Sequence, residues 1–191
     1  MPSRALTAFA AASLLSLGSC TNFGVPSTHT TDVHARPSEP LVLAREEGER
    51  RVRRFGQSAP TFILKVDSRN GGSRDLVMGY EDIPPGRSIP PHRHLMADEI
   101  VFVHKGQGAV EVGGLKREFT EGATIYIPRD VRVTIRNTGG GPLSIAFIFS
   151  APGFEQYLRE VSAPEGESFV PLTDAQLAAA RKRHEWHTKY G

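Results

Sequence analysis

The sequence offers no route to an internal disulfide bond, because Cys20 is the single cysteine among 191 residues. It also has little net charge, +2 at neutral pH, and its basic residues are interleaved with acidic ones. The basic patch expected of a nucleic-acid-binding protein is therefore missing. The uncharged apolar run at residues 5–17 is too short to span a bilayer comfortably. The length of 191 residues and the hydrophobic content of 39% predict one globular domain with extensions.

The first 20 residues resemble the signal peptide of a bacterial lipoprotein. Arg4 precedes the apolar run, and Leu-Gly-Ser then leads to Cys20. In such proteins the signal, here residues 1–19, is removed and the new N-terminal cysteine carries lipid. The alternatives are an ordinary cleaved signal or an uncleaved one. The resemblance implies a location at the bacterial cell envelope through a lipid anchor only, and Thr21 favours the outer membrane if the host has two membranes.

The segment that follows, residues 20–40, is rich in Ser, Thr and Pro and shows no apolar periodicity, so it is expected to be a flexible tether. His29 and His34 lie in it and are interpreted as bystanders rather than metal ligands. The next stretch, residues 45–54, carries five Arg and three Glu. It is either a solvated strand or loop, or a segment that touches anionic lipid headgroups.

Short strands separated by turns are predicted from residue 61 onward. Residues 62–66 end in an Asn-Gly-Gly turn, and residues 110–119 contain a second hairpin turn at Gly113 and Gly114. Residues 131–136 alternate apolar and basic or polar side chains, as a half-buried strand does. About eight strands at this spacing predict an all-β fold, a small antiparallel barrel or jelly roll, over residues 41–151.

The last forty residues, 152–191, are predicted to be a short helical extension that covers an edge or a mouth of the barrel. One helix is expected to run from Pro152 to about Val161, and a capping box at Thr173 predicts a second from Asp174 to about Thr188. His184 and His187 lie one turn apart on that second helix. A surface metal clip is conceivable there, but a solvated face is the preferred interpretation.

The densest group of candidate ligands lies at residues 92–99. His92 and His94 are two apart, so on a strand both imidazoles point to one face. Glu99 begins the next apolar run and shares a face with Val101 and Val103. Two imidazoles and a carboxylate that converge from adjacent strands suit Fe(II), Mn(II), Zn(II) or Ni(II) and leave coordination positions open.

The spacing of this segment resembles the first motif of the cupin family, Gly-x5-His-x-His-x4-Glu-x6-Gly. The fixed positions are all present, as Gly86, His92, His94, Glu99 and Gly106. The resemblance extends over about residues 60–150 and implies the cupin fold, an antiparallel β-barrel or jelly roll. It also implies metal ligation by His92, His94 and Glu99, and the possibility of a homodimer.

The second cupin motif is only partly present. Gly122, Pro128 and Asn137 match it, Asp130 stands where the family prefers Gly, and Val133 stands where the family has its fourth ligand, a His. Three ligands can still hold a metal, although more weakly than the four of the family motif. The alternative is that His92, His94 and Glu99 form a polar cluster without metal. Asp98 is expected to point away from the cavity, which leaves Asp130 as the better substitute ligand.

The function implied is that of an envelope-tethered cupin whose divalent metal site acts on a small organic molecule, in the manner of a dioxygenase or a lyase. The alternative is a non-catalytic module that binds a small ligand at a degenerate metal site. No catalytic residue is assigned by the sequence, and whether the protein is an enzyme stays open. The expected cavity lining is apolar, and its predicted members are Val101, Val103, Ile125, Ile127 and Val133.

Overall fold

The computed structural model describes residues 39–56 and 61–191. The predictions for the signal peptide, Cys20, His29 and His34 lie outside these residues and stay predictions. In the described part of the chain no helix is both long and apolar enough to cross a membrane.

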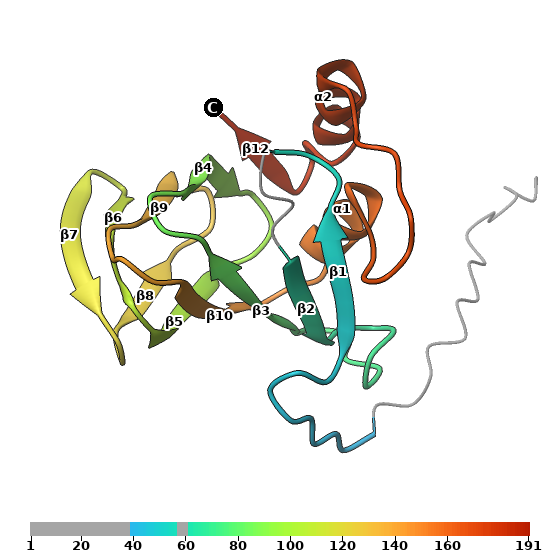
Figure 1. The fold of residues 1–191 in the computed structure, drawn as a ribbon, viewed down its shortest axis with the longest axis horizontal. Coiled ribbons are helices and arrows are strands. Elements are labelled where there is room, and N and C mark those ends of the chain that lie inside the picture. Colours follow the sequence, from blue (N-terminus) through green and yellow to red (C-terminus); the bar gives the residue numbers. More distant parts are fainter. Residues whose placement is uncertain (1–38, 57–60) are drawn as a thin grey trace, which may run out of the picture. The chain divides into compact units, whose positions relative to one another are not determined.

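Two antiparallel sheets form a jelly-roll β-sandwich, as the sequence predicts (Figure 1). The first sheet contains, in spatial order, β11 (Ser162–Pro164), β1 (Glu49–Arg53), β2 (Thr61–Val66), β3 (Val77–Ile83), β10 (Leu143–Phe149), β5 (Glu99–Lys105) and β8 (Thr124–Ile127). The second contains β12 (Thr188–Tyr190), β4 (Ser88–His94), β9 (Val133–Asn137), β6 (Gln107–Val112) and β7 (Leu115–Thr120). All strand pairs within the two sheets are antiparallel, so short turns can connect neighbouring strands.

The structure shows the predicted alternation of buried and exposed side chains in strands that have one face in the core. Along β5, Glu99, Val101 and Val103 are buried while the residues between them are exposed. The turn between β6 and β7 uses Gly113 and Gly114, whose φ angles of 55° and 87° lie in the region that glycine adopts most easily. Sequence periodicity therefore predicts which side chains of these strands face the inside of the sandwich.

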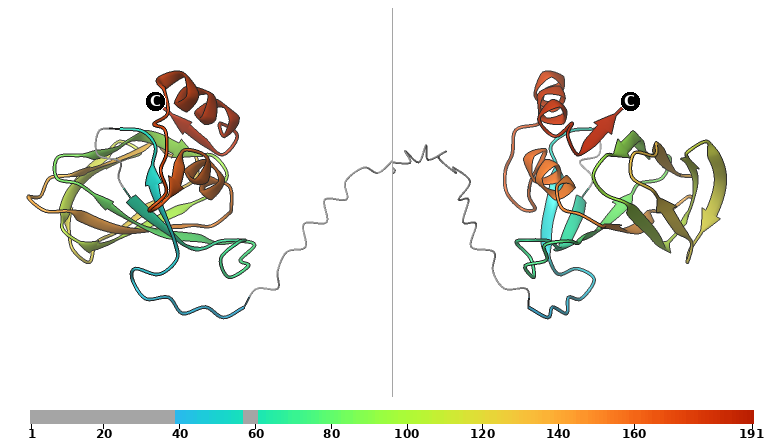
Figure 2. Two further views of the ribbon diagram at one scale, coloured as in Figure 1. Left: turned by 45° about the vertical axis from the view of Figure 1, so that its right-hand side comes forward. Right: turned by 180° about the vertical axis from the view of Figure 1, so that it is seen from behind.

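Two helices follow the last strand of the barrel and lie beside β1 and β12, as the views in Figure 2 agree. Helix α1 spans Phe154–Glu160 and helix α2 spans Asp174–Arg183. The predicted capping box at Thr173 is present: the Thr173 hydroxyl oxygen accepts from the Gln176 backbone N–H, and the Gln176 side-chain oxygen accepts from the Thr173 backbone N–H.

The second helix is shorter than predicted, and the residues beyond it are not a solvated face. Helix α2 ends at Arg183, and Thr188 belongs to β12, which pairs with β4 as an edge strand of the second sheet. His187 is fully buried, and His184 is largely buried with its Nε2 atom 2.8 Å from Glu160. The helical pattern fails here because three residues of strand carry too little periodicity to be separated from a preceding helix.

The hydrophobic core has two parts. One fills the space between the sheets and includes Val101, Val103 and Ile127. The other lies where α1 and α2 meet the first sheet, and it includes Phe149, Tyr157 and Leu158. The helical extension is therefore packed against the sandwich through apolar side chains.

Candidate metal centre and its pocket

The two strands that carry the predicted ligands belong to different sheets and are joined by a short turn, residues 95–98. His92 and His94 lie on β4, and Glu99 begins β5. All three side chains are buried, and their nearest ligand atoms lie within 4.8 Å of one another. In residues 39–56 and 61–191 no other group of three or more such side chains gathers in this way.

Each histidine is held so that one ring nitrogen faces the cluster. Nδ1 of His92 lies 2.8 Å from the Pro90 carbonyl oxygen, which can only accept, so Nδ1 carries the proton. This leaves Nε2 of His92 with its lone pair free. A hydrogen bond at the far nitrogen of this kind fixes the tautomer that a metal ligand needs.

His94 is oriented by a residue from the end of the chain. Its Nδ1 atom lies 3.0 Å from the Thr188 hydroxyl oxygen, which also lies 2.9 Å from Nδ1 of His187. With Nε2 of His94 left for a metal, Nδ1 donates to Thr188 and the Thr188 hydroxyl donates to His187. Aromatic rings surround the imidazole, among them Phe149 at 4.6 Å and Phe154 at 4.7 Å between ring centroids.

Burial sets the protonation state of the cluster. It lowers the pKa values of His92 and His94, so both imidazoles are neutral at pH 7, the form in which histidine binds metal. Burial, with a smaller contribution from the charge of Glu81, raises the pKa of Glu99 to about 8. Without a metal Glu99 therefore holds its proton at pH 7, and metal binding would release it.

The buried atoms that face one another lack partners in the described part of the chain. Nε2 of His94 and Oε2 of Glu99 lie 3.5 Å apart, and neither makes a hydrogen bond. Two ligands bound at about 2.1 Å to one metal lie about 3.0–3.4 Å apart at octahedral or tetrahedral angles. The spacing of His94 Nε2 and Glu99 Oε2 is therefore close to that of two ligands on one divalent metal, which would satisfy two buried polar atoms that are otherwise costly.

Val133 lies beside the candidate ligands. It is the direct partner of His92 across β9 and β4, so the two side chains share one face of the sheet. Its side chain is buried and lines the same pocket as the three ligands. The residue that the cupin motif predicts at the fourth-ligand position thus borders the cluster with an isopropyl group, which cannot coordinate.

Neither aspartate near the cluster replaces the missing ligand. Asp98 forms an ion pair with Arg129 at 3.3 Å, directed away from the cluster as expected. Asp130, the better sequence candidate, instead pairs with Arg93 at 3.3 Å with 64% of its side chain exposed. Its backbone explains the orientation, because φ is 60° and the residue forms a tight turn after Pro128.

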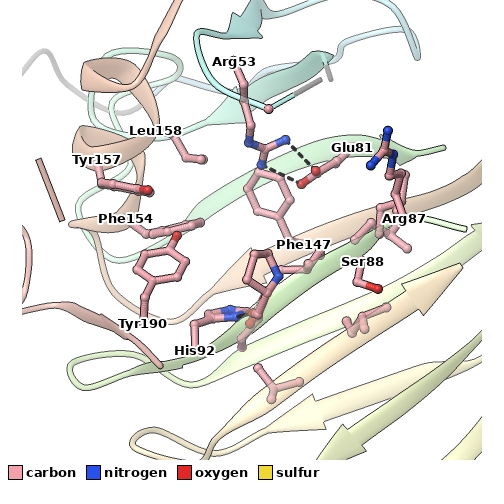
Figure 3. A pocket seen from close by; sticks show the side chains of 18 of the residues that line it. Arg53, Glu81, Arg87, Ser88, His92, Phe147, Phe154, Tyr157, Leu158 and Tyr190 are labelled. Carbon is pink, nitrogen blue, oxygen red and sulfur yellow. Dashed lines mark hydrogen bonds and ion pairs between the residues drawn. The ribbon is translucent and has the colours of Figure 1, made fainter. Parts of the chain in front are cut away.

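A pocket of about 220 Å³ opens above the cluster (Figure 3). Its walls come from both sheets and from the helical extension, and its lining includes Phe147, Phe154, Leu158, Val133, Ile135 and Ile145. Of the predicted apolar lining only Val133 is correct. Val101, Val103, Ile125 and Ile127 belong to the core between the sheets but do not border the pocket, part of whose wall comes from α1, α2 and β12.

Sequence reasoning missed the residues that the extension supplies to this site. Thr188 orients His94, while Tyr190 stacks on His92 with ring centroids 5.8 Å apart. Arg53 reaches the same pocket from β1 and binds Glu81 through two hydrogen bonds, of 2.5 and 2.9 Å. In the sequence, the one feature that indicated an Arg–Glu ion pair was the mixture of Arg and Glu in residues 45–54.

Replacement of Thr188 by valine should raise the dissociation constant for Mn(II) about 10–100-fold, the usual cost of losing a ligand's outer partner. Valine has nearly the same shape but leaves Nδ1 of His94 without an acceptor. Titration of chelator-treated protein with Mn(II) in a calorimeter measures the change. Thr120→Val, on the exposed side of β7, is the control, and equal affinities in both variants would contradict the positioning role.

Comparison with known proteins agrees with the geometry. A family model described as Cupin domain matches residues 79–149. The chain is 32% identical over 144 residues to dimethylsulfoniopropionate lyase DddW of Ruegeria pomeroyi, covering 70% of this chain and 90% of that protein. It is 23% identical to tetracenomycin polyketide synthase protein TcmJ of Streptomyces glaucescens, over 58% of this chain and 81% of that one.

The fold is also found among solved structures. A predicted oxalate decarboxylase from Thermotoga maritima superposes with a TM-score of 0.51 at 19% identity, over 59% of this chain and all of that one. At this identity the likeness concerns the fold alone.

Proposed function

This chain belongs to the cupin family, and on that premise we propose that it is a metal-dependent enzyme acting on a small organic molecule held above His92, His94 and Glu99. The reaction class that we favour is a lyase reaction. Its support is the relative from Ruegeria pomeroyi, a lyase by name, which aligns with most of this chain.

The observation that carries the metal site is the pair of buried, unpartnered atoms, His94 Nε2 and Glu99 Oε2, beside the free Nε2 of His92. Burying three such groups for packing alone would be costly. A bound divalent ion would supply Lewis-acid activation of a substrate oxygen. The donor set is compatible with Fe(II), Mn(II), Zn(II) and Ni(II).

The residues of this chain supply the rest of the site. Phe154 and Leu158 form part of an apolar wall that limits access of water to the cluster. Thr188 and the Pro90 carbonyl hold the two imidazoles in fixed orientations. Because Val133 cannot coordinate, a metal bound here would keep one coordination position for the substrate, on the face of the cluster toward the pocket.

Turnover by metal-loaded protein tests this proposal. The full chain, loaded in turn with Fe(II), Mn(II), Zn(II) or Ni(II), is incubated with dimethylsulfoniopropionate and with other small carboxylates, and substrate consumption is followed by NMR. The proposal predicts consumption of one of these that stops after chelation and resumes when the metal is restored. Consumption that survives chelation would contradict it.

The second candidate is a non-catalytic cupin that binds a small ligand, and Val133 is the observation that favours it. With one ligand fewer than the family motif, the site is expected to hold metal less tightly. In the experiment above this candidate predicts saturable binding of a ligand without consumption.

We also propose that the protein is held at the cell envelope by a lipid on Cys20. Replacement of Cys20 by alanine should leave a larger, unprocessed precursor, abolish lipid labelling and release the protein from the membrane fraction. Electrophoresis after labelling with a radioactive fatty acid measures both effects. Unchanged processing of the variant would indicate an ordinary signal peptidase and contradict lipidation.

A further inference from the structure

Two hydrogen-bond donors on the helical wall of the pocket are buried without a well-formed hydrogen bond to any described residue. Nε of Arg181, on α2, is buried without a hydrogen bond. The hydroxyl of Tyr157, on α1, approaches Tyr190 but makes no hydrogen bond of good geometry. Both residues line the pocket. Buried donors left in this way are costly unless a ligand supplies the acceptors.

Arg181 differs from the two basic residues that follow it on α2. Lys182 forms an ion pair with Glu185, and Arg183 forms one with Glu160. Arg181 pairs with no carboxylate in the described part of the chain, and its guanidinium lies over the ring of Tyr190, 4.5 Å from the ring centroid. Because Tyr190 also stacks on His92, this cation lies one aromatic ring from the metal cluster.

Arg181 is the pocket-lining guanidinium group for which the described residues supply no carboxylate partner, unlike Arg53. The positive charge of Arg53 is offset by Glu81, and Figure 3 shows this pair at the edge of the pocket opposite His92. Among the described lining residues Glu99 is the one other carboxylate, and it lies in the cluster with His92 and His94 rather than beside Arg181. An anionic ligand is therefore favoured in this low-dielectric space, more so with a metal bound.

We infer that the molecule held in this pocket is a small carboxylic acid, whose carboxylate accepts hydrogen bonds from Arg181 and Tyr157. Its apolar part lies against Phe154 and Leu158. The end that faces His92, His94 and Glu99 is the reacting end, a point that rests on the proposed function. The size follows from the cavity of 220 Å³: since a dry cavity of about 150 Å³ binds benzene, a short chain or a single ring fits.

The test compares butanoate with butanamide, which have nearly the same shape and differ in charge. Dissociation constants are measured by ligand-observed NMR for the wild-type chain, Arg181→Met and Lys182→Met, each metal-free and loaded with Mn(II). Lys182→Met removes the same charge from the neighbouring residue of α2, whose side chain is 80% exposed. Tyr157→Phe removes the second donor while keeping the ring.

The wild-type chain and Lys182→Met should bind butanoate at least about tenfold more tightly than butanamide, the lower bound for a hydrogen bond to a charged group. This preference should disappear in Arg181→Met and weaken in Tyr157→Phe. A wild-type chain without the preference, or one whose preference survives in Arg181→Met, would overturn the inference. A preference seen only with Mn(II) and insensitive to Arg181 would also overturn it, because the metal would then hold the carboxylate.

The two proposals fail in different ways in this experiment. The carboxylate preference is measured in metal-free protein, so it does not depend on the metal. Absence of Mn(II) binding in the wild-type chain would refute the metal-dependent function while leaving the carboxylate site intact. Arg181→Met is expected to bind Mn(II) as tightly as the wild-type chain, since Arg181 is not a ligand.

Discussion

Replacement of Glu99 by glutamine is expected to lower the affinity for divalent metal by at least about 10–100-fold, because loss of a direct ligand costs no less than loss of its outer partner. Glutamine keeps the size of the side chain and resembles the protonated form that burial imposes on Glu99 in metal-free protein. The variant should therefore stay folded, and the loss of metal cannot be attributed to unfolding. His92→Ala and His94→Ala are expected to lose metal to the same extent.

Metal content after dialysis against limiting Mn(II) measures the effect. His104→Ala is the matched control, because His104 lies on β5 with an exposed side chain on the face opposite Glu99. His184→Ala controls for the histidines of the extension. If His104→Ala or His184→Ala lost as much metal as Glu99→Gln, the assignment of His92, His94 and Glu99 as ligands would be wrong.

The same variant makes a prediction about pH. The pKa of Glu99 is raised from 4.5 to about 8 by burial, so the folded metal-free protein binds a proton here that the unfolded chain releases. Stability relative to Glu99→Gln should therefore fall as pH rises from about 4.5 to about 8, and level off above this range. Urea unfolding of both proteins, at several pH values with chelator present, checks the sign.

Replacement of Val133 by histidine should convert three ligands into four and tighten metal binding. Val133 lies directly across from His92 on the neighbouring strand, so an imidazole at residue 133 would extend from the same face of the sheet as His92. If affinity rises tenfold, bound metal in excess adds about 1.4 kcal/mol to the free energy of unfolding. Without metal the larger polar ring should destabilise the protein, because it replaces a buried isopropyl group.

Melting temperatures of the wild-type chain and Val133→His, each with and without Mn(II), decide this prediction. The variant should melt lower than the wild-type chain without metal and show the larger upward shift when metal is added. A variant that melts lower in both conditions and binds no additional metal would show that an imidazole at residue 133 cannot reach the cluster.

The fold and the position of the three candidate ligands follow from local sequence patterns. His92, His94 and Glu99 can be placed on facing strands because period-two alternation fixes which side of a strand is buried. The position of Val133 follows in the same way from β9. The sequence could not indicate the pocket with equal success, since alternation identifies inward residues but not which of them border an open space.

The residues that the C-terminal extension adds to the site could not be predicted from the sequence, for a related reason. Thr188 and Tyr190 belong to a three-residue strand whose place beside β4 depends on tertiary packing. A local pattern cannot reveal that Thr188 would meet His94, which lies 94 residues away along the chain. The same holds for Arg181, which from its sequence alone is one of three basic residues that favour the end of a helix.

The claim that His92, His94 and Glu99 form a metal centre is tested most directly by a crystal structure of the full chain grown with Mn(II), with data collected at a wavelength where manganese scatters anomalously. We expect an anomalous peak about 2.0–2.2 Å from Nε2 of His92, Nε2 of His94 and a carboxylate oxygen of Glu99. If crystals grown with Mn(II) in excess over protein showed no anomalous peak among these three side chains, the claim of a metal centre would be contradicted.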